Sequence, residues 1–408
     1  MTSATDARVP GHATGHPALR RLVADPEGFA RDAWGRAAVF TPADDHDAAD
    51  LFDEAAVDEL ISRRGLRTPF IRVAKDGSTL PTREFTSGGG VGAGIADQVD
   101  DSKLSALFAD GSTLVLQALH RTWPPLIDFT QQLASELGHP VQVNAYVTPP
   151  QSRGFDDHYD VHDVFVLQIS GRKRWRIHEP VHPAPLRDQP WTDRREAVAE
   201  AAGTPPVIDA VMEPGDCLYL PRGYLHAATA LGDISTHLTF GVHTWTRHAL
   251  GRTMLDRALL DVAGDLDVRT SLPLGVRVGD PAEVAPDFEL VRARLLQAIS
   301  GLSADDVAAV LASKSQASGR PEPVGPLAQL RAARSLTDDT NLVLRRNLEP
   351  RLETHDDGVR LTTRAGVLEL GVEDAAAAEM ILAGEPVRAG ILGLDLARRL
   401  LRAGVATT

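Results

Sequence analysis

The sequence has a single cysteine, few aromatic residues and no long apolar run. With Cys217 alone, an intramolecular disulfide and any cysteine-based zinc site are excluded. No apolar run approaches the roughly 18 residues that a membrane-spanning helix needs, and residues 1–16 lack the apolar core of a signal peptide. We therefore expect a cytoplasmic protein without a membrane partner, which begins with a disordered N-terminal lead over residues 1–16.

Positive charge is also in short supply. The chain has 42 Lys and Arg residues against 56 Asp and Glu residues, a net charge of −14. This balance argues against binding nucleic acid by bulk electrostatics. Part of the acidic excess gathers in one segment, which contains Asp44, Asp45, Asp47, Asp50, Asp53 and Glu54. We interpret this segment as a solvated surface; a field that attracts a basic substrate segment is the alternative.

The length of 408 residues predicts two or three folding units. In the middle of the chain, strand-like runs are separated by turns rich in glycine and proline. The predicted strands are Val141–Val147, Val164–Ser170, Arg174–Ile177, Val207–Val211, Cys217–Leu220, His226–Ala230 and Thr236–Val242. Many short strands with such turns favour a barrel or a sandwich over a parallel α/β sheet.

After Trp245 the pattern becomes helical. Residues 315–326 are rich in Ser, Gly and Pro and are predicted to form a linker. Beyond it, a hairpin with Asp356-Asp357-Gly358 at its turn is followed by two short helices, which suggests a winged-helix-like unit. Acidic and basic residues are nearly balanced there. Because a winged helix that binds DNA normally carries a basic face, we expect a structural or partner-docking role.

The segment around residue 158 has the pattern of a metal site. In an extended chain, His158 and Asp160 point to the same face, and an apolar strand follows them. A third ligand is available at His226, which begins a later strand 68 positions on (226 − 158). Two histidines and one carboxylate without thiolate suit Fe(II), and would also accept Mn, Co or Ni. The sequence therefore predicts a facial metal triad that leaves three octahedral positions open.

A lysine is predicted to point into the same barrel. Strand alternation sends Arg172, Arg174 and Arg176 to one face and Lys173 with Trp175 to the other. Three arginines on one face indicate solvent exposure. An inward lysine needs an anionic partner, so Lys173 is the predicted clamp for the far carboxylate of a 2-oxo acid bound at the metal.

Taken together, these motifs resemble the JmjC/cupin ribosomal oxygenase family of Fe(II)- and 2-oxoglutarate-dependent protein hydroxylases. The segments that carry the resemblance are Asn144-Ala145-Tyr146-Val147-Thr148-Pro149-Pro150, His158-Tyr159-Asp160, Asp163–Gln168, Gly171-Arg172-Lys173-Arg174-Trp175 and Pro214–His226. The resemblance is close over the catalytic domain and looser beyond it.

The resemblance implies an α+β protein built on a double-stranded β-helix, the cupin/JmjC jelly-roll barrel. It implies a catalytic domain at 17–245, a helical dimerisation region at 246–314 and, after the linker, a winged-helix-like domain at 327–408. A homodimer is expected.

The resemblance also implies roles for single residues. His158, Asp160 and His226 would bind iron, and Lys173 would bind 2-oxoglutarate. Its position is lysine in the eukaryotic histidyl hydroxylases of the family and arginine in the bacterial arginyl hydroxylase. The remaining residues are assigned as follows: Asn144 and Tyr146 line the co-substrate pocket, His237 is either a pocket or a core residue, and His162 is pocket wall rather than ligand.

The reaction implied is hydroxylation of a C–H bond, with Fe(II), O2 and 2-oxoglutarate as cofactors and co-substrates. The expected substrate is the β-carbon of an arginine or histidine in a ribosomal protein. A second interpretation keeps the chemistry but takes a natural-product peptide or a free amino acid. A third is a catalytically silent cupin that acts as a binding module, against which the intact triad argues.

Overall fold

The computed structural model describes most of the chain, which forms two compact units. One lies within Gly11–Thr244 and the other within Trp245–Thr408. The described residues are 16–43, 50–75, 77–150, 152, 155–355 and 358–408. Several predicted features lie outside them: the N-terminal lead up to residue 15, the acidic Asp44, Asp45 and Asp47, and Asp356 and Asp357 of the hairpin turn.

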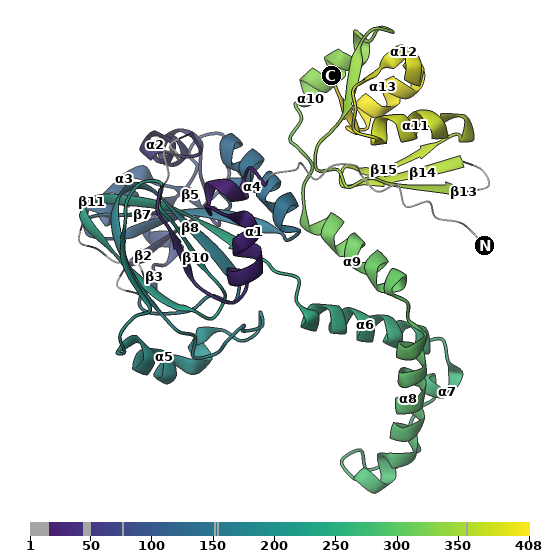
Figure 1. Cartoon of the computed structure of the whole chain (residues 1–408), viewed down its shortest axis with the longest axis horizontal. Helices are drawn as coiled ribbons and strands as arrows, with labels where there is room; N and C mark the ends of the chain where they lie inside the picture. The colour runs from purple at the N-terminus through teal and green to yellow at the C-terminus, as the bar shows by residue number, and fades with distance from the viewer. Residues whose placement is uncertain (1–15, 44–49, 76, 151, 153–154, 356–357) are drawn as a thin grey trace. The chain divides into compact units, whose positions relative to one another are not determined.

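A large antiparallel sheet is the centre of the first unit (Figure 1). Its strands follow the order β1-β10-β8-β11-β7-β6-β2-β3, and β9 pairs with β8 outside that path. The strands are β1 (Val39–Thr41), β2 (Ile71–Lys75), β3 (Ser78–Thr79), β6 (Thr113–Leu116), β7 (Val141–Thr148), β8 (Asp163–His178), β9 (Ile208–Met212), β10 (Cys217–Leu220) and β11 (Leu225–Val242). A separate two-stranded sheet joins β4 (Thr86–Ser87) to β5 (Gln98–Val99). The prediction of antiparallel strands in place of a parallel α/β sheet is confirmed.

Two long strands, β8 and β11, replace four of the predicted short ones. β8 has 16 residues and β11 has 18. The sequence predicted breaks at Gly171 and Gly232, but both strands continue, and the register between them shifts after Leu231. Both glycines have a positive φ, +62° and +79°, which permits a bulge inside a paired strand. A Cβ at position 171 would lie 1.9 Å from the carbonyl oxygen of Ile234, so only glycine fits there.

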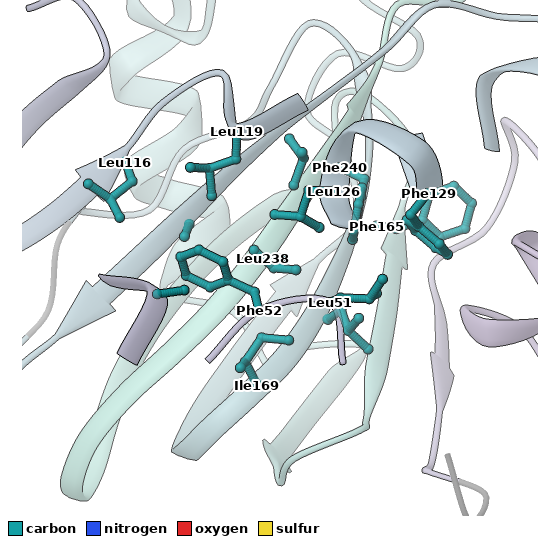
Figure 2. Packing of buried hydrophobic residues seen from close by; sticks show 14 of the residues in the cluster. Leu51, Phe52, Leu116, Leu119, Leu126, Phe129, Phe165, Ile169, Leu238 and Phe240 are labelled. Carbon is teal, nitrogen blue, oxygen red and sulfur yellow. The ribbon is translucent and has the colours of Figure 1, made fainter. Parts of the chain in front are cut away.

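Helices cover one face of the sheet and form the main apolar core with it (Figure 2). The sequence predicts a helix that starts at Pro124-Pro125 and ends at Gly138, and helix α4 spans Pro124–Leu137 with Gly138, whose φ is +68°, at its C-terminal cap. Its Leu126 and Phe129 are buried, and the Phe129 ring lies 5.2 Å from the ring of Phe240 on β11. Because successive side chains of a strand alternate between its two faces, the residues that alternate with this core point to the opposite, inner face of the sheet.

The inner face of the same strands carries polar and aromatic side chains. On β7, Ala145 belongs to the helix-side core, so its neighbours Asn144 and Tyr146 point the opposite way. On β8, Trp175 and Ile177 belong to a second buried cluster. The candidate site is built on this inner face.

Three helices in the first unit differ in how well the sequence predicts them. The sequence predicts a helix from Asp53 through Arg64, and helix α2 spans Glu54–Arg63. The side chain of Asp53 accepts a hydrogen bond from the amide of Ala56 at 2.7 Å. Helices α3 (Asp101–Ala109) and α5 (Arg195–Ala202) were not predicted. Near the start of the chain, α1 (Pro26–Gly28) passes into a π-helical turn, η2 (Phe29–Ala33), before β1.

The second unit begins with four helices: α6 (Arg247–Val262), α7 (Leu266–Arg269), α8 (Pro281–Gly301) and α9 (Ala304–Ser318). The spacing of Ser303 and Asp306 predicts a capping box, and the two residues form one at the start of α9. The predicted linker at 315–326 is partly wrong. Residues 315–318 continue α9, because Ala, Lys and Gln in its last turns are good helix formers, and α10 (Pro326–Arg334) starts at the final linker residue.

The rest of the second unit is a small α+β structure with its own core. Strand β12 (Asn341–Leu344) lies between β16 (Val387–Arg388) and β17 (Ala406–Thr407), and β14 (Gly358–Thr363) lies between β13 (Arg351–His355) and β15 (Gly366–Leu370). The helices are α11 (Ala375–Leu382), α12 (Ala389–Leu392) and α13 (Leu394–Arg402). Leu361, Ile381 and Leu400 are among its fully buried residues.

Within the described part of the chain, no single helix has the length and apolarity to cross a membrane; α8 and α9 taken as one pair, bent by 86°, meet the criterion by length and composition alone.

Candidate metal centre

Two imidazoles and one carboxylate meet beside the start of β11. Ligand-capable atoms of His158, Asp160 and His226 all lie within 4.8 Å of one another. Asp160 Oδ2 is 3.8 Å from His226 Nε2, and the centroids of the two imidazole rings are 4.4 Å apart. In the described part of the chain, this is the one group of three or more His, Cys, Asp and Glu residues arranged so closely. The structure therefore brings together the three residues that the sequence singled out.

Backbone hydrogen bonds join the two segments that carry the triad. The amide of His226 donates to the carbonyl oxygen of His158 at 2.9 Å, and the amide of His158 donates back to His226 at 3.3 Å. The amide of Gly223 donates to the carbonyl oxygen of Asp160 at 3.0 Å. Gly223 has a φ of +96°, and a Cβ there would lie 2.6 Å from the carbonyl oxygen of His182. The turn before β11 thus requires glycine, and it holds both segments in register.

The second nitrogen of each imidazole ring is tied to the backbone. His158 Nδ1 lies 2.7 Å from the carbonyl oxygen of Asp156, and His226 Nδ1 lies 3.1 Å from that of Tyr224. Because a carbonyl oxygen can only accept, each Nδ1 carries the proton. Each Nε2 therefore keeps its lone pair for a metal ion, as in ligating histidines oriented by backbone carbonyls.

The electrostatics of the triad also favour metal binding. Burial lowers the pKa of His226 to about 4, and repulsion from His158 adds to this, so the imidazole of His226 is neutral at neutral pH. Burial by itself would raise the pKa of Asp160, but the Coulombic influence of His162, His226, His158 and Arg72 outweighs burial and holds that pKa below its usual range. Two neutral nitrogens and one carboxylate are the donor set of a non-haem Fe(II) site.

Lys173 is buried in the barrel without a carboxylate partner among the described residues. Its side chain is 3% exposed, and its Nζ donates to Thr148 Oγ1 at 2.9 Å. Burial lowers the pKa of Lys173 to about 7. The predicted alternation is confirmed, since Trp175 is also buried while Arg172, Arg174 and Arg176 are exposed. A buried ammonium group of this kind fits the far carboxylate of a 2-oxo acid.

Tyr146 and His237 lie together on the inner face, next to Lys173. Their rings stack with centroids 4.9 Å apart and planes inclined by 4°. The His237 ring also meets Trp175 edge-on at 5.3 Å, and its Nδ1 is buried without a hydrogen-bond partner. Burial, with the charge of Lys173 second, lowers the pKa of His237 well below its usual value. His237 is thus a neutral side chain in the wall of the candidate pocket, and one of its ring nitrogens has no hydrogen-bond partner.

Asn144 has a contact that the sequence did not suggest. Its Oδ1 accepts a hydrogen bond from the amide of Ala118 at 3.0 Å. Ala118 has a φ of +56°, at the turn that leads from β6 into the short helix η4 (Leu119–Arg121). The side chain therefore stabilises this turn, while it stands on the same face of β7 as Tyr146.

His162 lies outside the triad. Its ring stacks on that of His243, with centroids 5.4 Å apart and planes inclined by 15°, and His162 is absent from the metal-capable group. The extended strand β8 begins only at Asp163, so His162 precedes the regular strand, although it is near enough to Asp160 to contribute to lowering the pKa of that carboxylate.

Three residues near the site were missed by the sequence analysis. Thr148 accepts from Lys173. Trp191, on the long connection between β8 and β9, has its ring 6.3 Å from that of His158. Arg72, on β2, donates to the hydroxyl of Tyr146 at 3.3 Å. Of these, only Arg72 had a usable signal, an arginine inside the apolar run of β2.

The ion pair between Asp163 and Arg222 allows a test of the stability of the strands around the triad. Asp163 is fully buried and accepts from Tyr219 Oη at 2.8 Å, from the amide of Arg222 at 3.1 Å and from its Nη1 at 3.3 Å. Asp163→Ala leaves the guanidinium of Arg222 uncompensated, and we expect it to lower the free energy of unfolding by roughly 3 kcal/mol. Tyr219→Phe removes one hydrogen bond and should lower it by about 1 kcal/mol.

Chemical denaturation followed by tryptophan fluorescence measures both losses. Equal losses for the two variants would contradict the interpretation of Asp163 as a paired, buried charge.

Comparison with known proteins shows that the chain is similar to a domain family and to several named proteins. Residues 120–250 match the JmjC domain family. Ribosomal oxygenase 1 of Rattus norvegicus is 30% identical over 225 residues, 54% of this chain and 36% of that protein. The bifunctional lysine-specific demethylase and histidyl-hydroxylase NO66 of Aedes aegypti is 39% identical over 136 residues, 33% of this chain and 21% of that protein. The chain thus spans about a third or less of the length of these curated relatives.

Solved structures support the fold over nearly the whole chain. The Escherichia coli ribosomal oxygenase YcfD matches with a TM-score of 0.54 at 17% identity, covering 95% of this chain and 98% of that chain. The same protein in complex with cobalt and 2-oxoglutarate matches with a TM-score of 0.51 at 18% identity and the same coverage. The resemblance to JmjC ribosomal oxygenases that the sequence motifs indicated is confirmed by these comparisons.

Proposed function

We propose that this chain, in which residues 120–250 form a JmjC domain, is an Fe(II)- and 2-oxoglutarate-dependent oxygenase that hydroxylates an arginine or histidine side chain of a ribosomal protein, at the β-carbon. The observation that carries the proposal is the geometry of His158, Asp160 and His226, with donor atoms within 4.8 Å of one another, in the same barrel as the buried Lys173.

The relatives support both parts of the proposal. Several are named ribosomal oxygenase or histidyl-hydroxylase. YcfD, which shares the fold, has been solved with cobalt and 2-oxoglutarate and with cobalt and succinic acid. The triad and the lysine of this chain provide the donors and the cation that such a pair of ligands needs.

When bound, Fe(II) with 2-oxoglutarate and O2 supplies the oxidising power for the hydroxylation, and 2-oxoglutarate is converted to succinate and CO2. The residues of the chain itself would bind and orient the metal ion and the co-substrate. His158, Asp160 and His226 would hold the ion on one face and leave the remaining positions open. Lys173 would pair with the far carboxylate, and Thr148 fixes the direction of its ammonium group.

The buried aromatic side chains exclude water from the site. Trp175 and His237 are 5% and 3% exposed. Trp175 lies 6.2 Å from the ring of His226 and 5.3 Å from that of His237. Exclusion of water on this side lowers the local dielectric constant, and a low dielectric constant strengthens the interaction between Lys173 and an anionic co-substrate.

The helices of the second unit support the proposed homodimer. They expose large apolar side chains, each at least half exposed, which are Leu255, Leu259, Leu260, Leu266, Phe288 and Leu296. An apolar surface of this kind is typical of an interaction site, and we assign it to a second copy of the chain. We assign partner docking, without DNA binding, to the winged-helix-like domain, whose acidic and basic residues nearly balance.

Reconstitution tests the proposal directly. The purified protein is loaded anaerobically with Fe(II) and 2-oxoglutarate, mixed with ribosomal proteins from a strain that lacks this gene, and then exposed to air. We expect succinate to form and one oxygen atom to be added to a single arginine or histidine, detected by mass spectrometry. A parallel reaction without 2-oxoglutarate should leave the proteins unchanged. Succinate without any modified ribosomal protein would contradict the substrate while keeping the oxygenase chemistry.

A further inference from the structure

Arg72 stands on the face of the sheet that carries the candidate site. Cross-strand pairing runs from Arg72 on β2 to Val115 on β6, from Val115 to Tyr146 on β7, and from Tyr146 to His237 on β11. Directly paired residues of antiparallel strands point to the same face. Its neighbours on β2, Ile71 and Val73, point the other way into the helix-side core. The guanidinium group is therefore directed into the barrel.

Two aromatic side chains hold this guanidinium group next to the triad. Its Nη2 donates to the hydroxyl of Tyr146 at 3.3 Å, and its carbon Cζ lies 5.5 Å from the ring centroid of Phe155. The ring of Phe155 is in turn 5.9 Å from that of His158. The charge of Arg72 reaches Asp160, where it contributes to stabilising the carboxylate.

In the part of the chain that the structure describes, no carboxylate forms a direct ion pair with Arg72, and its Nε is buried without a hydrogen-bond partner. The side chain as a whole is only half-buried, so a molecule entering from solvent can reach it. A guanidinium group left unpaired beside a metal-capable triad has donors available for a substrate.

We propose that Arg72 determines which side chain the enzyme accepts: it donates hydrogen bonds to a target side chain that carries an acceptor and no positive charge, and it excludes arginine. The inference rests on the proposed function and narrows its substrate class. A neutral imidazole, an amide or a carboxylate can accept from the guanidinium group. A second guanidinium group would meet a like charge in a site where Lys173 and a metal ion already contribute positive charge.

Arg72 also has a structural alternative, which is to brace Tyr146 and Phe155. The ratio of turnover between two targets distinguishes a role in substrate selection from this structural role. A general loss of order lowers turnover of all targets together, so the ratio between two targets is unaffected by it. If Arg72 selects targets by charge, its substitution changes that ratio, and the direction of the change follows the sign of the charge at position 72.

The experiment uses the full chain loaded with Fe(II) and 2-oxoglutarate. The probe is a pooled set of synthetic peptides, each centred on one histidine or one arginine of the ribosomal proteins from the same organism. Wild type is compared with Arg72→Gln, Arg72→Glu and Arg72→Lys. Lys75→Gln is the matched control, because it removes a positive charge from the same strand, three residues away on the opposite face. Site-resolved mass spectrometry reports the added oxygen, and succinate is measured in parallel.

We expect wild type and Lys75→Gln to oxygenate histidine peptides and to leave arginine peptides at background. Relative to histidine peptides, oxygenation of arginine peptides should rise at least about tenfold above that background in Arg72→Gln and further in Arg72→Glu, and Arg72→Lys should largely suppress it. Arginine peptides oxygenated by wild type, or an unchanged ratio in Arg72→Glu, would overturn the role of Arg72 while leaving the oxygenase in place. Absence of succinate with wild type would instead overturn the proposed function, and this inference with it.

Discussion

Replacing His158 with alanine is expected to lower the affinity for Fe(II) more than a hundredfold and to abolish turnover of 2-oxoglutarate. Loss of a residue that merely supports a metal ligand typically weakens binding 10- to 100-fold, and His158 supplies a donor atom itself. Its Nδ1 is committed to the carbonyl oxygen of Asp156, so Nε2 is the donor atom that the substitution removes. Titration with Co(II), followed by its visible absorption, measures the affinity without turnover.

His162→Ala is the matched control, because it removes an imidazole four residues away that stacks on His243 and lies outside the triad. We expect its metal affinity to stay within about tenfold of wild type. Thermal unfolding of both variants checks that each remains folded. Wild-type metal binding by His158→Ala, or a loss in His162→Ala as large as in His158→Ala, would show that the ligands are assigned wrongly.

Lys173→Met should raise the dissociation constant for 2-oxoglutarate between about tenfold and a hundredfold, because a charge-assisted hydrogen bond contributes roughly 1.5–3 kcal/mol. Methionine keeps the volume of the buried stem, so packing in the barrel is maintained. The neighbouring Arg174 points outward and pairs with Asp209 at 2.6 Å, and Arg174→Gln is expected to bind 2-oxoglutarate as wild type does. Calorimetric titration of the metal-loaded protein without oxygen measures the constants.

The pH dependence of binding tests the same lysine independently. Burial lowers the pKa of Lys173 to about 7, so below pH 7 the free protein already carries the cation that the carboxylate needs. Above pH 7 the protein must take up a proton as it binds, and the dissociation constant should rise about tenfold per pH unit until the lysine of the complex itself titrates. In Lys173→Arg, which stays charged, binding should vary little over this range. A flat profile for wild type would place the clamp elsewhere.

Local sequence patterns were sufficient to predict that His158, Asp160 and His226 lie close together and that Lys173 points inward. His158 and Asp160 precede an apolar strand, His226 follows a turn built by proline and glycine, and strand alternation alone separates Lys173 from its arginine neighbours. These features depend on residues close together in the chain. The same holds for helix α4, whose proline start and glycine end are both present in the structure.

Features that depend on distant pairing were not predictable. The sequence signals at Gly171 and Gly232 are those of turns, and only the pairing of β8 with β11 converts them into bulges. Arg72 is more than seventy positions from Tyr146 (146 − 72 = 74), and its position in the site depends on the pairing of β2, β6 and β7. Helix α3 lacks a clear apolar stripe, with Leu104 as its one buried residue.

The reciprocal backbone hydrogen bonds between His158 and His226 make the triad a preorganised site. These hydrogen bonds join backbone atoms and do not involve a metal ion, so we expect ion binding to order side chains but little backbone, with little loss of conformational entropy. Removal of the ion by a chelator should therefore be reversible without refolding. In hydrogen exchange, the amides of His226 and Gly223 should be as protected in the metal-free protein as those of the central strands, which would make this turn part of the stable framework of the barrel.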